Sequence, residues 1–540
     1  MFKSKYLKAG VFSTAFALTL AGCASEPDSE EASTDIDDTD AGEEAAGDDV
    51  SAGDNDLVIG VSSDATSMDP HTSSDVPSGN AQTNIYDTLV KYDTNMELEP
   101  LLAKEWEPVE DDVWEFKLRE DVYFHDGTEF NAEVVEANIE RILSEETASP
   151  RAILVEIIED IEIVDDHTIQ FITEDPFAPL PAHMAHYAIS IISQDVIDED
   201  NARVEEGGQP GDYVNENPVG TGFFKFDYWD HGDKVVLKNN EDYWGENAKV
   251  DSVTLQVIPE DLTRVGELET GGAHIIDPVD TSDMTRVESA DGANVYERNA
   301  ASITYLGYNM EKEPFDDARV RRAISKTLNK EAMLEGILDG TGATAFGPVD
   351  ETNFGYSEDV NQLDRDPEKA KELLAEAGYE DGFETTIWTN DTRERMDIAE
   401  LTQAGLAEIG VDAEIEVLEW GAYLDATSAG EHDMFILGLS LGTGDADYPM
   451  HMLFHSDSVG EGNRVMMDDP EFDEMLYQAR IQQDEDARLA LYEDATEYLI
   501  EEAPMSFLYH PSHVMGYRDE IEGFWSDASG LYQLQDVEIN

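Results

Sequence analysis

Cysteine and positive charge are both scarce in this chain of 540 residues. Cys23 is the only cysteine, which excludes an intramolecular disulfide and a cysteine nucleophile anywhere else in the sequence. The chain has 32 Lys and Arg against 123 Asp and Glu, a formal net charge of −91. Nucleic acids and anionic lipids are negatively charged and bind Lys and Arg side chains. The excess of acidic residues therefore strongly disfavours either as a partner.

An apolar run long enough for a comfortable membrane span is also missing at the start of the chain. The run from Ala9 to Ala21 is too short, and Lys3, Lys5 and Lys8 precede it. A charged start, a short apolar run and small residues before Cys23 are the pattern of a secretory signal peptide. We expect residues 1–22 to be a signal and the mature protein to lie outside the cytoplasm.

Large apolar residues are nearly absent from the next segment, Ala24 to Asp56, which has fourteen acids and no Lys or Arg. Such a segment cannot bury enough surface to fold, so we expect a disordered acidic tether over residues 23–56. Acids continue along the rest of the chain and do not form one binding tail. Their number indicates a solvated acidic surface suited to a saline or alkaline habitat.

Motifs of hydrolytic enzymes are missing as well. The sequence has no G-x-S-x-G and no H-E-x-x-H, and its many carboxylate pairs do not single out a catalytic pair. His183 and His186 have a helical spacing that could bind a metal, but no third ligand accompanies them. We predict no enzyme activity, no metal and no cofactor, and keep an extracytoplasmic hydrolase as the alternative from another class.

The elements that can be predicted beyond the tether alternate between strands and helices. Leu57 to Val61 is a short apolar run typical of a buried strand, and the segment from Asn84 to Leu89 is predicted to be helical. Trp114, Phe116 and Leu118 alternate with charged residues, which predicts a strand. The roughly 480 residues after the tether are too many for one core, so we expect two or three domains.

The segment from Asn217 to Gly245 predicts a β-hairpin with turns at both ends. Phe224, Phe226 and Tyr228 alternate with polar residues, and glycines precede them. Further along, Ile303 to Met310 is an apolar strand, and a helix over Arg393 to Ile409 leads to a strand at 413–418. Alternating helices and short strands indicate an α/β architecture.

Two of these segments resemble a known family. Phe124-His125-Asp126-Gly127-Thr128, behind an alternating strand and before a helix, and the hairpin at 217–245 resemble solute-binding proteins of the peptide/nickel class, family 5, which serve ABC importers. Leu20-Ala21-Gly22-Cys23 resembles the lipobox of bacterial lipoproteins, which implies a lipid on Cys23. In the family, His125 and Asp126 have a structural role.

The resemblance implies a fold and a division into domains. The implied fold is the type II periplasmic-binding-protein fold, an α/β fold of two lobes with a hinge and an extra inserted domain. The expected division is 57–92 and 215–300 for the first lobe, with its return at 510–540, 93–214 for the inserted domain and 301–509 for the second lobe.

The resemblance also implies ligand-binding residues around a cleft between the lobes. They are Ser67, Met68, Tyr86, Trp388, Arg393, Trp420, Thr443, Gly444, Asp445, Asp447 and Arg464. Met68 alone is more often a core residue, and turn capping is an equal alternative for Asp445 and Asp447. Gly444 stands where many peptide binders have tryptophan, and the phrase at 443–447 is closer to a glutathione-type subgroup.

Three arginines are candidates for a carboxylate clamp, since guanidinium makes bidentate bonds. They are Arg393, Arg395 and Arg464, and a helix-surface or loop role is an equal alternative. The implied function is a monomeric receptor, anchored to the membrane by lipid, that delivers peptides to the permease of an ABC importer. A receptor for glutathione, a nickel chelate or another small solute is the alternative within the same fold.

Overall fold

A computed structural model describes residues 55–358 and 360–540 of the chain. Cys23, the predicted signal peptide and nearly all of the predicted tether lie outside these residues. Within the described ranges, no helix combines the length and hydropathy that a membrane span requires.

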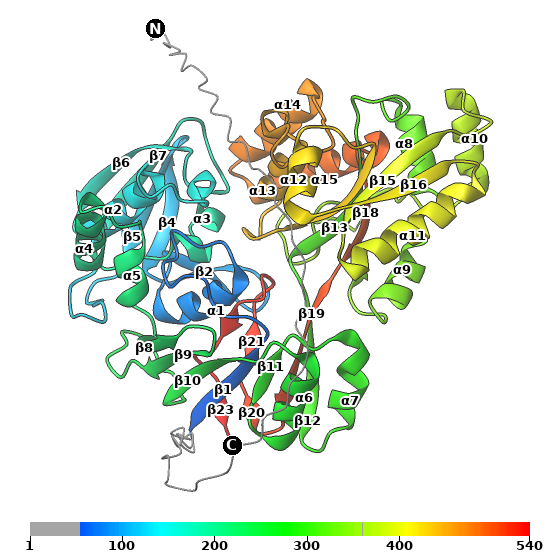
Figure 1. Cartoon of the computed structure of the whole chain (residues 1–540). Coiled ribbons are helices and arrows are strands. Elements are labelled where there is room, and N and C mark those ends of the chain that lie inside the picture. The colour runs from blue at the N-terminus through cyan, green and yellow to red at the C-terminus, as the bar shows by residue number, and fades with distance from the viewer. Residues whose placement is uncertain (1–54, 359) are drawn as a thin grey trace, which may run out of the picture. The chain divides into compact units, whose positions relative to one another are not determined.

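A seven-stranded sheet contains the first predicted strand at its centre (Figure 1). Strand β1 pairs in parallel with β10 on one side and β11 on the other. The order is β12-β19-β11-β1-β10-β9-β8, with β12 (Ala293–Asn299), β19 (Ser512–Arg518), β11 (Ile275–Asp277), β1 (Asp56–Val61), β10 (Ser252–Val257), β9 (Lys234–Asn239) and β8 (Phe224–Asp230). The hairpin predicted from the alternating aromatics is β8 and β9.

Both faces of this sheet are covered, which explains the unbroken apolar character of β1. Leu57 and Ile59 face one core, and Val58 packs against another together with Ile276. Helices α6 (Asp261–Thr270) and α7 (Met284–Ser289) belong to the second of these cores, and α1 (Val76–Ile85) packs on β8 and β9.

The helix predicted over Asn84–Leu89 is wrong in its position. Helix α1 begins earlier, with Asp75 as the N-cap accepting from Ser78 N, and it ends where Tyr86 adopts an extended backbone. The sequence of α1 is polar and has no apolar stripe, so its periodicity gave no signal. The displacement matters because Tyr86 and Asp87 leave the helix and turn toward the pocket described below.

A six-stranded sheet forms the core of the second half of the chain. Its order is β14-β18-β13-β17-β15-β16, with β14 (Ala343–Thr344), β18 (Met505–His510), β13 (Ser302–Tyr308), β17 (Met434–Ser440), β15 (Glu384–Asn390) and β16 (Asp412–Leu418). Side chains of β13 alternate between two cores, Ile303 and Tyr305 on one face and Leu306 and Tyr308 on the other. Helices therefore cover both faces of this sheet.

The helices around this sheet divide between its two faces. On the face of Leu306 lie α8 (Ala318–Ser325), α9 (Lys330–Ile337), α10 (Pro367–Ala377) and α11 (Arg393–Glu408). On the other face lie α12 (Trp420–Ser428), α13 (Asp447–Phe454), α14 (Pro470–Ile481) and α15 (Glu485–Glu502). The predicted start of α10 is confirmed, since Asp366 accepts from Lys369 N and Pro367 opens the helix.

A third, antiparallel sheet has its own core. Its order is β4-β5-β7-β6, with β4 (Ala103–Glu110), β5 (Val113–Leu118), β7 (Thr168–Thr173) and β6 (Ile158–Asp165). Helix α2 (Ala132–Leu143) packs against β6, and the short α3 (Leu180–His183) contributes Leu180 to the same core. Helix α4 (Gln194–Glu205) contacts α2, and the short α5 (Asp212–Glu216) contacts α4. Asn131 caps α2 as predicted, accepting from Val134 N.

Two chain crossings join the seven-stranded and six-stranded sheets. Strand β12 ends at Asn299 and β13 begins at Ser302, while β18 ends at His510 and β19 begins at Ser512. The crossings contact each other, because Ala300 N donates to Pro511 O at 2.9 Å and His510 Nδ1 lies 2.9 Å from Ser302 O. Short pairs complete the structure, namely β2 (Val90–Tyr92) with β3 (Leu98–Pro100), β20 (Ile521–Glu522) with β23 (Glu538–Ile539) and β21 (Trp525–Ser526) with β22 (Tyr532–Gln533).

Candidate functional site

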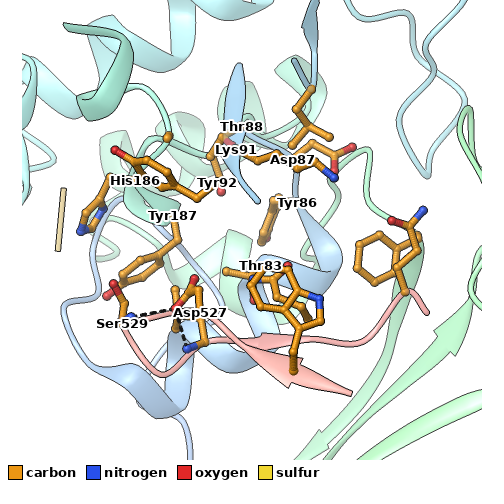
Figure 2. Close-up of a pocket in the computed structure, with 18 of the residues that line it drawn as sticks. Thr83, Tyr86, Asp87, Thr88, Lys91, Tyr92, His186, Tyr187, Asp527 and Ser529 are labelled. Carbon is orange, nitrogen blue, oxygen red and sulfur yellow. Dashed lines mark hydrogen bonds between the residues drawn. The ribbon is translucent and has the colours of Figure 1, made fainter. Parts of the chain in front are cut away.

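A pocket of about 140 Å³ brings together five stretches that are distant in the sequence. They are the end of α1 with the segment after it, the segment 185–190, Phe223 and Tyr243 of the hairpin segment, the C-terminal segment 525–536 and Gly442 from the loop after β17. In Figure 2, Asp87 and Lys91 are drawn above Tyr86, and Asp527 and Ser529 lie below it. A mixed polar and aromatic lining of this kind suits a small polar solute.

The predicted hairpin segment positions Tyr86 and Asp87 in this pocket. Gly222 N donates to Ile85 O at 2.9 Å, and a Cβ on Gly222 would lie only 2.6 Å from that carbonyl oxygen. Thr221 Oγ1 then donates to Asp87 Oδ2 at 2.8 Å. A glycine is needed at 222 because the backbone of Ile85 approaches too closely for any side chain.

His125, from the motif that resembles the family, makes hydrogen bonds with the backbone of the turn that contains Gly220 and Gly222. Its backbone N–H donates to Gly220 O, and its Nε2 lies 2.9 Å from Gly222 O. Asp126 accepts from Ser193 Oγ at 2.6 Å. The motif therefore supports the site without lining it.

Two carboxylates, of the buried Asp87 and the half-buried Asp527, give the pocket its negative side. Burial raises the pKa of Asp87 to about 6, although the Thr221 hydroxyl, the Trp244 indole N–H and the nearby Lys91 oppose the shift. Burial likewise raises the pKa of Asp527 to about 6, against backbone N–H donation from Leu531 and Ser529. Neither carboxylate has a Lys or Arg nitrogen within 4.0 Å among the described residues.

One side of the pocket is aromatic and carries hydrogen-bond donors. His186 and Tyr187 stack with ring centroids 4.7 Å apart and lie on the same side of the view in Figure 2. Burial lowers the pKa of His186 well below its usual value, so the ring is neutral at pH 7. Its Nδ1 accepts from Ala188 N, which leaves the proton on Nε2 as a donor.

The loop after β17 packs beside the aromatic side of the pocket. Tyr92 Oη donates to Thr443 O at 2.5 Å, and Gly444 has a φ of +65° with the Tyr92 ring 2.8 Å from where a Cβ would lie. A glycine is thus required at 444 by the approach of Tyr92.

Asp445 and Asp447 of this loop are each occupied by an arginine. Arg488 binds both oxygens of Asp445 at 2.7 Å, and Arg480 binds those of Asp447 at 2.9 and 2.8 Å. Both carboxylates are buried, at 3% and 2% exposure. The arginines hold the pKa of Asp447 below its usual value despite its burial. In this structure the ion pairs of Asp447 and Asp445 connect the loop to α14 and α15, respectively.

Ser67 and Met68 lie behind the pocket. Ser67 Oγ and Met68 N both donate to Asn215 Oδ1, at 2.8 and 2.6 Å. Met68 is fully buried in the core of the first sheet, and its carbonyl accepts from Tyr86 Oη at 3.0 Å. Of the predicted residues from the N-terminal half, Tyr86 lines the pocket and the other two anchor it.

Most of the remaining predicted residues form a separate group in and after the parallel strands β15 and β16. The Arg395 guanidinium lies 5.1 Å from the Trp420 ring centroid, and its Nη1 donates to Asn390 Oδ1. The indole N–H of Trp388 is buried and has no hydrogen-bond partner in the described structure. Carboxyl ends of parallel strands are where open α/β sheets bind ligands.

Arg464 and Arg393 differ within this group. Arg464 Nη1 donates to Leu424 O at 2.6 Å and to hydroxyls of α12, and burial lowers its pKa. Arg393 projects into solvent with its side chain 92% exposed and approaches only Asp397, at 3.6 Å. The group is thus brought together around Arg395, Trp388 and Trp420, and Arg393 lies outside it.

Several pocket residues were missed from the sequence, among them Asp87, Lys91, Tyr92, Tyr187, Tyr243, Asp527 and Ser529. All but Tyr243, which belongs to the hairpin segment, come from segments without a motif, and only the tertiary fold brings the C-terminal stretch beside α1. His183 and His186 were noticed for their spacing, but each Nδ1 is engaged by backbone. Among residues 55–358 and 360–540 no group of three metal-ligating side chains converges.

Known proteins share both the sequence pattern and the fold. Residues 97–461 match the family model described as bacterial extracellular solute-binding proteins, family 5 middle. The chain is 30% identical to the dipeptide-binding protein of Escherichia coli K12 over 84% of this chain and 89% of that one. It is 28% identical to the glutathione-binding protein GsiB of the same organism over 90% and 94%.

A solved structure agrees with these matches. The periplasmic binding protein DppA of Helicobacter pylori, in complex with the peptide STSA, superposes with a TM-score of 0.75 and 32% identity, covering 90% of this chain and 98% of the other. The α/β sheets, their crossings and the matched residues agree with the family predicted from the sequence. The chain belongs to family 5 of the bacterial extracellular solute-binding proteins.

Proposed function

We propose that this protein captures peptides or peptide-like solutes outside the cytoplasm and delivers them to the permease of an ABC importer. The observation that carries the proposal is the pocket around Tyr86, which combines buried carboxylates with neutral donors and aromatic walls. A peptide presents an ammonium, a carboxylate and amide groups, and this lining offers a partner to each. The relatives named as dipeptide-binding and glutathione-binding proteins support the same class of solute.

The site in this proposal has two parts. Tyr86 and the other pocket residues form the part described above, and Trp388, Arg395, Trp420 and Arg464 form a second face that binds a carboxylate. The protein divides into lobes at the boundaries given in the sequence analysis, and solute binding changes the angle between them at the crossings near Ser302 and His510.

Titration calorimetry of the full-length chain with a dipeptide, a tripeptide and glutathione tests the proposal. We expect binding in the micromolar range or tighter and recovery of the intact peptide afterwards. Peptide cleavage that depends on one carboxylate of the protein would favour the hydrolase. Binding heat with nickel chelates alone would favour a nickel chelate as the solute.

The membrane anchor is a separate part of the proposal. We propose that Cys23 is the first residue of the mature chain and carries a lipid, with residues 24–56 as a tether. Intact-mass measurement of protein extracted from membranes with detergent tests it. A mass increase for two or three acyl chains that disappears in Cys23→Ser supports the anchor, and an unmodified Cys23 in the mature protein contradicts it.

A further inference from the structure

Four of the nine described Lys and Arg side chains that have no carboxylate oxygen within 4.0 Å lie in or beside the pocket. In so acidic a chain, most described Lys and Arg side chains lie within 4.0 Å of a carboxylate oxygen, as in the pairs Arg480–Asp447 and Lys249–Glu538. Among residues 55–358 and 360–540, the bases for which no such contact exists include Lys91, Arg119, Arg151 and Arg298. Each of these four lies in or beside the pocket.

Lys91 lines the pocket directly. In the described structure its ammonium makes no hydrogen bond or ion pair, although it lies near enough to lower the pKa of Asp87. An ammonium group has three donors, so Lys91 has bonding capacity left for a solute.

The three arginines lie on aromatic rings at the edge of the pocket. Arg151 and Arg298 lie 6.0 and 5.5 Å from the ring centroids of Tyr187 and Trp525, which both line it. Arg119 lies 4.8 Å from the Trp244 ring, whose N–H donates to Asp87. A guanidinium on an aromatic face keeps its edge free for a planar anion.

Arg151 is the one of the three that has a buried nitrogen, Nε, without a hydrogen-bond partner in the described structure. Its Nη2 donates to Ser74 O at 3.0 Å and only weakly, at 3.4 Å, to Tyr187 Oη. This guanidinium therefore has donor capacity left for a carboxylate of the solute. Arg119 Nε, in contrast, already donates to Leu101 O.

We propose that the pocket takes a peptide-like solute of net negative charge, with Lys91 and Arg151 binding a carboxylate that a neutral peptide lacks. The inference rests on the proposed function and narrows it to acidic solutes. Asp527, which lies on the other side of the lining from Lys91, receives the ammonium end. The bases thus keep the pocket attractive to anions although the rest of the surface repels them.

Two peptides that differ only in charge test this proposal. Calorimetry of the full-length chain compares Glu-Ala-Glu with Gln-Ala-Gln, which have nearly the same shape. We expect Glu-Ala-Glu to bind about tenfold tighter at low salt, because hydrogen bonds between charged groups are stronger than those that a neutral amide can make. We expect Arg151→Gln and Lys91→Met each to lower this ratio toward one.

Arg322→Gln is the matched control. Arg322 lies on α8, has no carboxylate within 4.0 Å in the described structure and does not line the pocket, so the ratio should stay at the wild-type value. Equal affinities of the unmodified protein for the two peptides overturn the inference and leave the receptor function standing. Failure to bind either peptide overturns both. Because the wild-type ratio needs no variant, a folding defect in Arg151→Gln leaves the test intact.

Discussion

Asp87 shows how the pocket's chemistry depends on burial more than on residue type. It is one acid among 123, yet it is almost fully buried and has no cationic partner within 4.0 Å in the described structure. Its carboxylate is held by a hydroxyl and an indole N–H, groups that stabilise the charge less than an arginine does. A solute ammonium would supply the missing positive charge.

The raised pKa of Asp87 predicts a pH dependence of stability. A carboxyl whose folded pKa is about 6 and whose unfolded pKa is 3.8 binds its proton more tightly in the folded state. Its effect on stability is therefore most favourable below pH 4 and is lost as pH rises through 6. The difference corresponds to about 3 kcal/mol at most.

Asp87→Asn should accordingly raise the free energy of unfolding at pH 7.5 and leave it nearly unchanged at pH 4. Urea unfolding followed by fluorescence at several pH values measures this. An equal change at both pH values would contradict the electrostatic cause.

Asp447 is expected to act as a structural residue, since Arg480 occupies both of its oxygens. Asp447→Asn leaves Arg480 without its counter-charge and should lower the free energy of unfolding by about 3 kcal/mol. Asp412, an exposed acid that makes no ion pair in the described structure, provides the control, since Asp412→Asn should change the free energy of unfolding by less than about 0.5 kcal/mol. A stable Asp447→Asn protein that has lost peptide binding would instead assign this acid to the solute.

At the scale of elements, the close contact between the backbones of Gly222 and Ile85 predicts that a side chain at position 222 weakens peptide binding. Gly222→Ala places a Cβ 2.6 Å from Ile85 O, so the turn must shift, with a cost of about 1–3 kcal/mol. Because Thr221 and Ile85 flank this contact, Asp87 and Tyr86 should move and peptide affinity should fall along with stability.

Gly266→Ala is the matched control for this prediction. Gly266 lies inside α6, and a Cβ there would meet nothing within 4 Å. Alanine should raise the free energy of unfolding by up to about 1 kcal/mol and leave affinity unchanged. Thermal melting and calorimetry of both variants measure the two effects, and equal affinities would show that the turn does not position the site.

Elements with strong alternation or good caps could be predicted from the sequence. The β8–β9 hairpin, β5, and the starts of α2 and α10 are confirmed because aromatic alternation and Asn or Asp caps act locally. Helix α1 could not be located, since its sequence is mostly polar and tertiary contacts alone bury seven of its ten residues. The pocket was harder to predict for the same reason. Tyr86 was predicted to bind the ligand, but Asp527 and Ser529, which line the same pocket, come from the other end of the chain.

For the whole molecule, the net charge of −91 predicts a strong response to salt. Repulsion among surface acids destabilises the compact state and is screened over about 10 Å at 0.1 M ionic strength. The melting temperature should rise by several degrees between 0.1 and 1 M NaCl. Sucrose at equal osmolality is the control, and an equal rise there would attribute the effect to solvent exclusion from the surface.

The central claim is that the protein carries peptide-like solutes without changing them. Native mass spectrometry of the full-length chain, purified from its own cells without unfolding, tests this most directly. We expect bound masses that correspond to intact short peptides or peptide-like acids and that are released on denaturation. A protein that is free of bound solute and also gives no heat with defined peptides, or one that carries only a metal chelate, would contradict the account.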